Sequence, residues 1–95
     1  MIKHLCSVKL RQDISGLEIA CHPEATHFIC KSGQIHFYKV NPKPSKLMRK
    51  IPSGVNTMNF SSYRIYRGWI NYGNIEFKSH QGNILKTENY NGYNG

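Results

Sequence analysis

The sequence predicts an all-β fold, either a small antiparallel barrel or a strongly bent sheet built from about seven short strands. Three observations support this prediction. Apolar and polar residues alternate with a period of two, turn residues recur at close spacing, and helical spacing is weak. With 95 residues, the chain has room for one hydrophobic core and excludes a multi-domain enzyme.

The N-terminal part predicts two hairpins. In residues 2–11, one face carries Ile2, Cys6, Val8 and Leu10 and the other carries Lys3, Ser7, Lys9 and Arg11, which is the alternation of a strand. Residues 17–21 alternate in the same way after turn residues at 12–16, so we expect them to pair with the first strand. Residues 26–30 and 35–40 are rich in β-formers, and the turn 31–34 joins them as a second hairpin.

Residues 41–54 form a basic, proline-rich connection of a different kind. Ser45 can cap one or two helical turns that reach Ile51, so the segment near 43–52 is expected to be a short helix or an irregular basic loop. Pro52 limits the length of any such helix.

The C-terminal half predicts a meander of strands at 63–67, 69–72, 74–80 and 83–88, separated by glycine-containing turns. Gly68 is a candidate bulge. Residues 1–88 are therefore expected to form a single β-rich domain. The Asn/Gly/Tyr-rich residues 89–95 are expected to fray.

Several classes of protein are excluded or disfavoured. No apolar run approaches the roughly 20 residues that cross a bilayer, and the N-terminus lacks a secretory pattern, so we expect a cytoplasmic protein. The potential metal ligands Cys6, Cys21, His22, His27 and Cys30 lack the close cysteine pairs of zinc sites. The sequence thus predicts buried thiols, no metal and no cofactor.

The distribution of charge is the most informative feature. The chain carries 13 Lys and Arg against 5 Asp and Glu, a formal net charge of +8. The stretch 25–75 contains no acidic residue and holds the whole surplus. We expect folding to gather these cations into a positive surface that attracts an anionic partner, although a solvated face that only keeps the protein soluble would have the same composition.

Two groups of residues are candidates for binding this partner. In the run 63–69, strand alternation places Arg64 beside Tyr66, which offers a guanidinium for phosphate next to a ring for a base. The alternative is that Tyr66 and Trp69 are ordinary cross-strand packing residues. The second group lies in the basic connection. The complete set of candidate binding residues is Lys39, Lys43, Lys46, Arg49, Lys50, Arg64, Tyr66, Arg67 and Trp69.

Three functions fit these features. The first is a non-enzymatic module that binds nucleic acid, RNA or single-stranded DNA, or a nucleoprotein. The second is a small inhibitor or adaptor, of the kind that a phage or mobile element encodes, which docks its basic face on an acidic protein surface. The third is a small ribonuclease with no assigned catalytic residues, for which His36, Glu76 and His80 are the acid–base candidates if they meet in one cleft.

Overall fold

The computed structural model describes residues 1–11, 16–61, 63–67, 69–89 and 93–94, and for residues 63, 66, 69–72, 93 and 94 it describes the backbone alone. The described chain is all β, with no helix. Eleven strands occur along it: β1 (Ile2–Lys9), β2 (Leu17–Ala20), β3 (His27–Lys31), β4 (Gln34–Val40), β5 (Arg49–Lys50), β6 (Thr57–Phe60), β7 (Tyr63–Tyr66), β8 (Trp69–Tyr72), β9 (Asn74–Lys78), β10 (Ile84–Asn89) and β11 (Tyr93–Asn94). The predicted fold class is confirmed.

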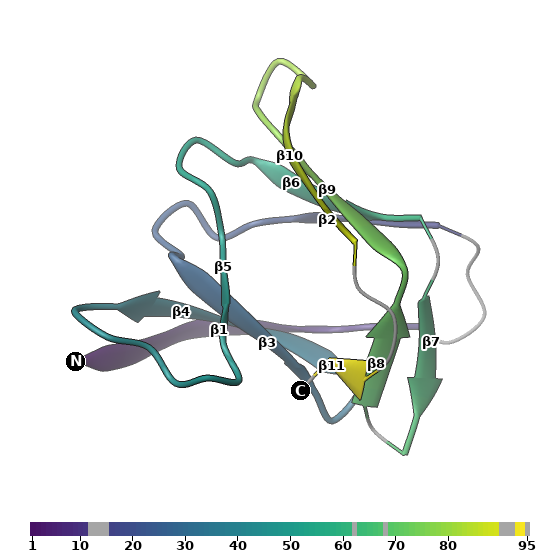
Figure 1. Ribbon diagram of the computed structural model, residues 1–95, viewed down its shortest axis with the longest axis horizontal. Coiled ribbons are helices and arrows are strands. Elements are labelled where there is room, and N and C mark those ends of the chain that lie inside the picture. The colour runs from purple at the N-terminus through teal and green to yellow at the C-terminus, as the bar shows by residue number, and fades with distance from the viewer. Residues whose placement is uncertain (12–15, 62, 68, 90–92, 95) are drawn as a thin grey trace.

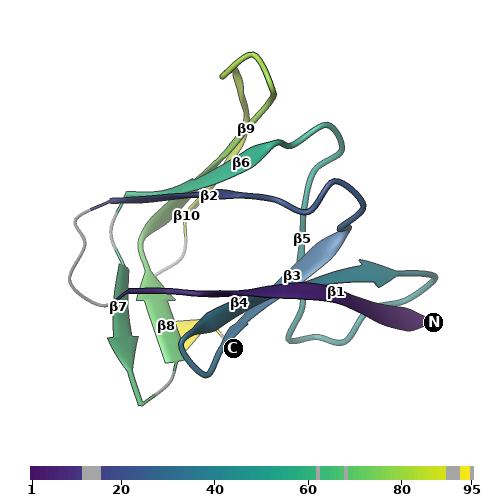
Figure 2. The same ribbon diagram turned by 180° about the vertical axis from the view of Figure 1, so that it is seen from behind.

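The strands form three antiparallel sheets. The first sheet has the order β1-β4-β3-β5, the second has the order β10-β9-β6-β2, and the third is the smaller β11-β8-β7. Figure 1 shows the first and second sheets as two layers, with the third sheet at one side, and Figure 2 shows the same layers from behind. The described strands form three separate sheets and do not close into a barrel.

The core lies between the first two sheets. Each sheet contributes two phenylalanines that are fully buried: Phe28 and Phe37 from the first, Phe60 and Phe77 from the second. The Phe28 and Phe77 ring centroids are 6.3 Å apart, which fixes the inward side of both sheets. Strand residues that alternate with these core positions must therefore point outward, in opposite directions on the two sheets.

The predicted hairpin between 26–30 and 35–40 is confirmed, because β3 pairs with β4 from His27↔Tyr38 to Lys31↔Gln34. Ser32 and Gly33 make the turn with φ values of 57° and 69°. Two successive positive φ values are the signature of a type I′ turn, which matches the twist of the strands it joins.

The other predicted hairpin is wrong. β1 pairs with β4 and β2 pairs with β6, so the first two strands belong to different sheets. The alternation of a strand determines which of its faces is buried and leaves its partner open. The eight residues of β1 match the long strand β4, and the end of β1 is held where Leu10 N–H donates to Gly33 O at 3.0 Å. Of the turn predicted at 12–16, residues 12–15 lie outside the described residues.

A bulge in β1 also changes the predicted faces of that strand. The register with β4 shifts between His4 and Cys6. On the N-terminal side of this shift, each residue lies on the side opposite to the one that simple alternation predicts. Ile2 and His4 therefore lie on the outward side, and Lys3 lies on the inward side, opposite Lys39. Sequence alternation alone groups Ile2 with the buried residues.

The basic connection is an irregular loop followed by the short strand β5, so of the two expected structures the loop is the one present. Ser45 begins a single turn instead of a helix: its Oγ accepts from Leu47 N–H at 3.2 Å and its carbonyl accepts from Met48 N–H at 3.1 Å. The turn ends there, and Arg49 and Lys50 pair with β3 instead of continuing a helix.

The C-terminal meander is correct in part. β7 pairs with β8, and β9 pairs with β10, but β8 and β9 lie in different sheets. Where a frayed tail was expected, Tyr93 and Asn94 pair with Asn71 and Ile70 of β8. The possible bulge at Gly68 lies outside the described residues.

Candidate nucleic-acid interface

The outward side of the first sheet carries a group of side chains that we call the basic face. Its residues are Ile2, His4, Ser7, Lys9, His27, Ile29, Lys31, Gln34, His36, Tyr38, Val40 and Lys50. Its centre consists of three cross-strand rows: Lys50–His27–Tyr38–His4, then Ile29–His36–Ser7, then Lys31–Gln34–Lys9. None of these twelve residues is acidic.

The three lysines of the basic face, Lys9, Lys31 and Lys50, are all exposed. Lys9 and Lys31 flank Gln34 in one row, and Lys50 stands at the sheet edge two rows away. Like charges on one sheet face repel one another, and no carboxylate on this face offsets that repulsion.

Rings occupy the space between the lysines. Tyr38 is half-buried, and the His4 ring meets it edge-on, with centroids 5.3 Å apart and planes at 66°. His36 lies in the adjoining row, with its ring centroid 6.0 Å from that of His4. Tyrosine and imidazole rings on a sheet surface are platforms on which unpaired bases stack.

Hydrogen bonds connect the row that contains His4 with the row that contains His36 and Ser7. Ser7 Oγ lies 2.8 Å from His4 Nε2 and 2.7 Å from His36 Nδ1, and His36 Nε2 lies 3.1 Å from the carbonyl oxygen of Lys31. This chain joins three strands of the sheet. The ring positions are therefore set by the sheet before any ligand arrives.

His27 is the buried polar residue of the basic face. Val40 N–H donates to Thr26 Oγ1 at 2.9 Å, and Thr26 Oγ1 lies 2.8 Å from His27 Nδ1. Burial, followed by the nearby Lys50 charge, lowers the pKa of His27. His27 is therefore a neutral part of the scaffold at pH 7, and not a cation.

The predicted binding residues are dispersed among several positions. Lys50 lies on the basic face, and Lys43 and Lys46 are exposed on the connection that precedes β5. Arg64 and Arg67 are exposed on β7 and on the turn that follows it. The backbones of Tyr66 and Trp69 pair across that turn, but their side chains lie outside what the structure describes.

Two predicted binding residues, Lys39 and Arg49, lie on the inward side of the first sheet. Arg49 pairs with the core residue Phe28 and is half-buried. Arg49 and Glu88 both act electrostatically on the Cys30 thiol, so a carboxylate lies in the same neighbourhood. Lys39 lines a cavity of about 450 Å³ together with Lys3 and Glu24. The expectation that the central cations share one exterior surface is therefore incorrect for these two.

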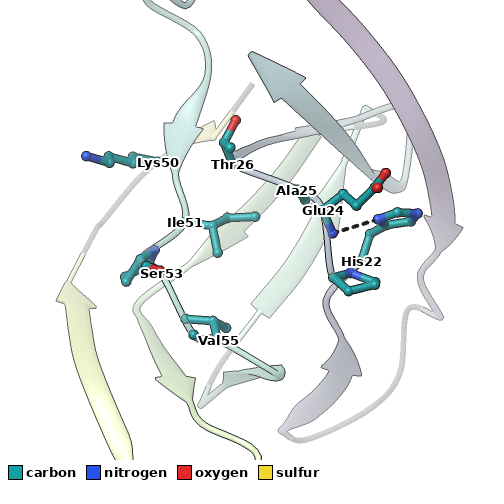
Figure 3. A pocket seen from close by; sticks show the side chains of 11 residues that line it. His22, Glu24, Ala25, Thr26, Lys50, Ile51, Ser53 and Val55 are labelled. Carbon is teal, nitrogen blue, oxygen red and sulfur yellow. Dashed lines mark hydrogen bonds between the residues drawn. The ribbon is translucent and has the colours of Figure 1, made fainter. Parts of the chain in front are cut away.

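A second concave region lies where the segments 22–26 and 50–55 meet, with a volume of about 310 Å³. Figure 3 shows Ile51 and Val55 between Glu24 on one side and Lys50 on the other. The Glu24 amide donates to His22 Nδ1 at 3.1 Å. Because a carboxylate and apolar side chains line this pocket, it suits an anion less well than the basic face.

The residues considered for metal binding have other roles. Burial raises the pKa of the Cys21 thiol to about 12, and burial, partly offset by Arg49, raises that of Cys30 to about 12. Both cysteines are protonated core residues at neutral pH. Among the described residues, no group of three or more His, Cys, Asp or Glu is placed to hold a metal ion.

The ribonuclease candidates do not meet. His36 stands between buried residues of β4 in the first sheet, and Glu76 stands between buried residues of β9 in the second. They point away from the shared core in opposite directions, while His80 lies in the turn after β9. Sequence reasoning instead missed His4 and Ser7, whose relation to His36 depends on the pairing of β1 with β4.

Comparisons of this chain with protein-family models, with curated proteins and with solved structures found no match. Within the described residues, no helix has the length and hydrophobicity to span a bilayer.

Proposed function

We propose that this protein binds single-stranded nucleic acid, RNA or DNA, across the basic face. The observation that carries the proposal is the composition of that face: three exposed lysines and the rings of His4, His36 and Tyr38, without a carboxylate. Lysines attract the phosphate backbone and the rings offer stacking surfaces, the combination used by sheet surfaces that bind unpaired strands.

A single strand fits this face better than a duplex. The surface is a sheet side, and the described residues include no helix to enter a major groove. Neighbouring strands lie about 4.8 Å apart, so the row from Lys50 to His4 crosses four strands and spans about 15 Å, the length of a few nucleotides. Lys43, Lys46, Arg64 and Arg67 are further exposed cations that can take up the strand beyond the face.

The test is binding of a mixed-sequence oligonucleotide over a range of salt concentrations. The triple variant Lys9→Gln, Lys31→Gln, Lys50→Gln removes the cations of the basic face. Three phosphate contacts to a single strand correspond to a reduction of about 2 in the slope of log K against log salt. We expect that reduction, together with weaker binding at every salt concentration.

The matched control removes the same charge elsewhere. Lys39→Gln, Lys78→Gln, Lys86→Gln lowers the net charge equally but leaves the basic face intact. Equal loss of slope in both triples would show that only net charge matters and would contradict the proposed interface. Weak, salt-insensitive retention of the wild type would overturn nucleic-acid binding and favour an acidic protein as the partner.

A further inference from the structure

The hydrogen-bond chain on the basic face has a direction. A carbonyl oxygen can only accept, so His36 Nε2 carries the proton that it donates to Lys31 O at 3.1 Å. In the neutral ring, Nδ1 then holds a lone pair and accepts the Ser7 hydroxyl hydrogen across 2.7 Å. Because that hydrogen is used, Ser7 Oγ accepts from His4 Nε2–H at 2.8 Å.

The two histidines therefore direct chemically different nitrogens at the Ser7 hydroxyl, one that accepts a proton and one that donates it. His36 offers a basic nitrogen and His4 offers an N–H, and the hydroxyl of Ser7 bridges them. The distance between His36 Nδ1 and His4 Nε2 cannot exceed the sum of the lengths of these two hydrogen bonds. Both nitrogens can thus reach oxygen atoms of one phosphodiester that takes the place of the serine hydroxyl.

We propose that His4 and His36 form an acid–base pair that cleaves RNA by transesterification; this inference rests on the proposed binding of nucleic acid to the basic face. His36 Nδ1 removes the proton of a ribose 2′-hydroxyl, and the 2′-oxygen attacks the adjacent phosphorus. The bond from phosphorus to the 5′-oxygen of the next nucleotide breaks, and His4, in its protonated form, gives that oxygen a proton. The products are a 2′,3′-cyclic phosphate and a 5′-hydroxyl.

RNA is the substrate class because it supplies its own nucleophile. The site needs only a base, an acid and positive charge for the phosphorane-like transition state. Lys31 and Lys9 lie in the next row of the face and can provide that charge, and Tyr38 beside His4 can stack an adjacent base. Ser7 is a positioning residue, which holds the two rings at this separation until the phosphodiester takes the place of its hydroxyl.

The charged and titratable groups that face the pair come from all four strands: Lys9 on β1, Tyr38 on β4, His27 and Lys31 on β3, and Lys50 on β5. No carboxylate occurs among them. Since catalysis requires one ring neutral and the other protonated, the rate should follow a bell-shaped dependence on pH.

The experiment uses a short end-labelled RNA and a DNA of the same sequence, with chelator present throughout. Wild type should convert the RNA to fragments ending in 2′,3′-cyclic phosphate and leave the DNA intact. His36→Gln and His4→Gln should each reduce the cleavage rate at least about 100-fold, the scale of general acid–base catalysis, at RNA concentrations that saturate binding. Each variant loses one ring of the basic face and should bind the DNA more weakly, but the three lysines and Tyr38 still hold it. His80→Gln, prepared in parallel, is the control for contaminating nuclease and should match wild type.

The outcomes separate the two proposals. RNA that is bound but stays intact overturns the cleavage and leaves binding standing, whereas failure to bind either strand overturns both. Equal cleavage by wild type and His36→Gln also overturns the acid–base pair. Ser7→Ala should retain part of the activity with an altered pH profile, because the two rings are no longer bridged. Its complete inactivity, together with a covalent protein–phosphate adduct in wild type, would identify Ser7 as the nucleophile instead and overturn the pair as proposed.

Discussion

The two outward faces of this protein are built on similar sheets and differ in almost every side chain. The outward side of the second sheet, which we call the mixed face, consists of Glu18, Ala20, Thr57, Asn59, Asn74, Glu76, Lys78, Ile84, Thr87 and Asn89. It carries two carboxylates and one lysine, and Lys78 Nζ lies 4.0 Å from Glu76 Oε1. The basic face carries three lysines, three histidines and a tyrosine, with no carboxylate.

This difference shows that the fold itself does not require a positive surface. Both sheets place two phenylalanines inward, and the mixed face shows that small polar residues with balanced charge are sufficient outward. Glu76 and Lys78 of the mixed face lie close enough to offset one another, whereas the lysines of the basic face have no such carboxylate among their face neighbours. An outward surface that deviates from this sufficient composition is the better candidate for function.

The largest expected effect tests the packing of the first two sheets against each other, on which the comparison of their outward faces depends. Phe77→Ala removes a fully buried ring that meets Phe28 from the other sheet. Deleting a buried aromatic side chain costs about 3–5 kcal/mol, so we expect the free energy of unfolding to fall by that amount in urea denaturation. A change below about 1 kcal/mol would contradict the packing of the two sheets, and with it the assignment of opposite outward faces.

The next largest effect concerns the Tyr38 ring of the basic face. Tyr38→Leu keeps a large apolar side chain but removes the stacking surface, and it should weaken binding of a single strand by about 1–3 kcal/mol. Tyr38→Phe is the matched control, because it keeps the ring and removes only the hydroxyl. If the phenylalanine and leucine variants weaken binding equally, the hydroxyl or the local fold matters and stacking on this face is refuted.

A charge-reversal pair compares the two faces directly. Lys31→Glu and Lys78→Glu change the net charge of the protein by the same amount, one on each face. On the basic face we expect a loss of about 1 kcal/mol in binding, since a phosphate contact is replaced by repulsion. On the mixed face the loss of binding free energy should be about a few tenths of a kcal/mol at most. Fluorescence anisotropy at one fixed salt concentration measures both, and a reversed ranking would place the interface on the mixed face.

How far the sequence could anticipate these faces depends on pairing. The alternation in residues 35–40 places His36 and Tyr38 on one side of their strand, as the structure does, and the turn predicted at 31–34 does join β3 to β4. Both are local patterns, and local patterns are preserved in the fold. The acid-free stretch also pointed to Lys50, and the structure places that lysine on the basic face.

The part of the candidate site that the sequence did not predict depends on contacts between residues far apart in the chain. The site residues His4 and Ser7 reach His36 only because β1 pairs with β4, about thirty residues away, and a bulge then turns His4 outward. Arg49 and Lys50 are neighbours in sequence and charge, yet β5 turns one inward and the other outward. A charge count over a window treats the two alike, whereas strand parity separates them.

The smallest expected effect distinguishes the buried histidine of the basic face from its exposed neighbours. Burial first, and the Lys50 charge second, lower the pKa of His27 below the ordinary value of 6.5. Above that value the side chain is neutral in both the folded and the unfolded chain. As the pH falls below it, the unfolded chain takes up the proton more readily than the folded chain, so stability is lost on the acid side.

Denaturation at a series of pH values from about 7.5 to about 5 should therefore show a smaller decline in His27→Gln than in wild type. One histidine contributes at most about 1.4 kcal/mol per pH unit to the slope, so the difference between the two curves must lie below that limit. The amide oxygen of the introduced glutamine can still accept the Thr26 hydroxyl, which keeps the local hydrogen bond and isolates the titration. Parallel curves for wild type and His27→Gln would show that folding does not lower the pKa of His27, and would contradict this prediction.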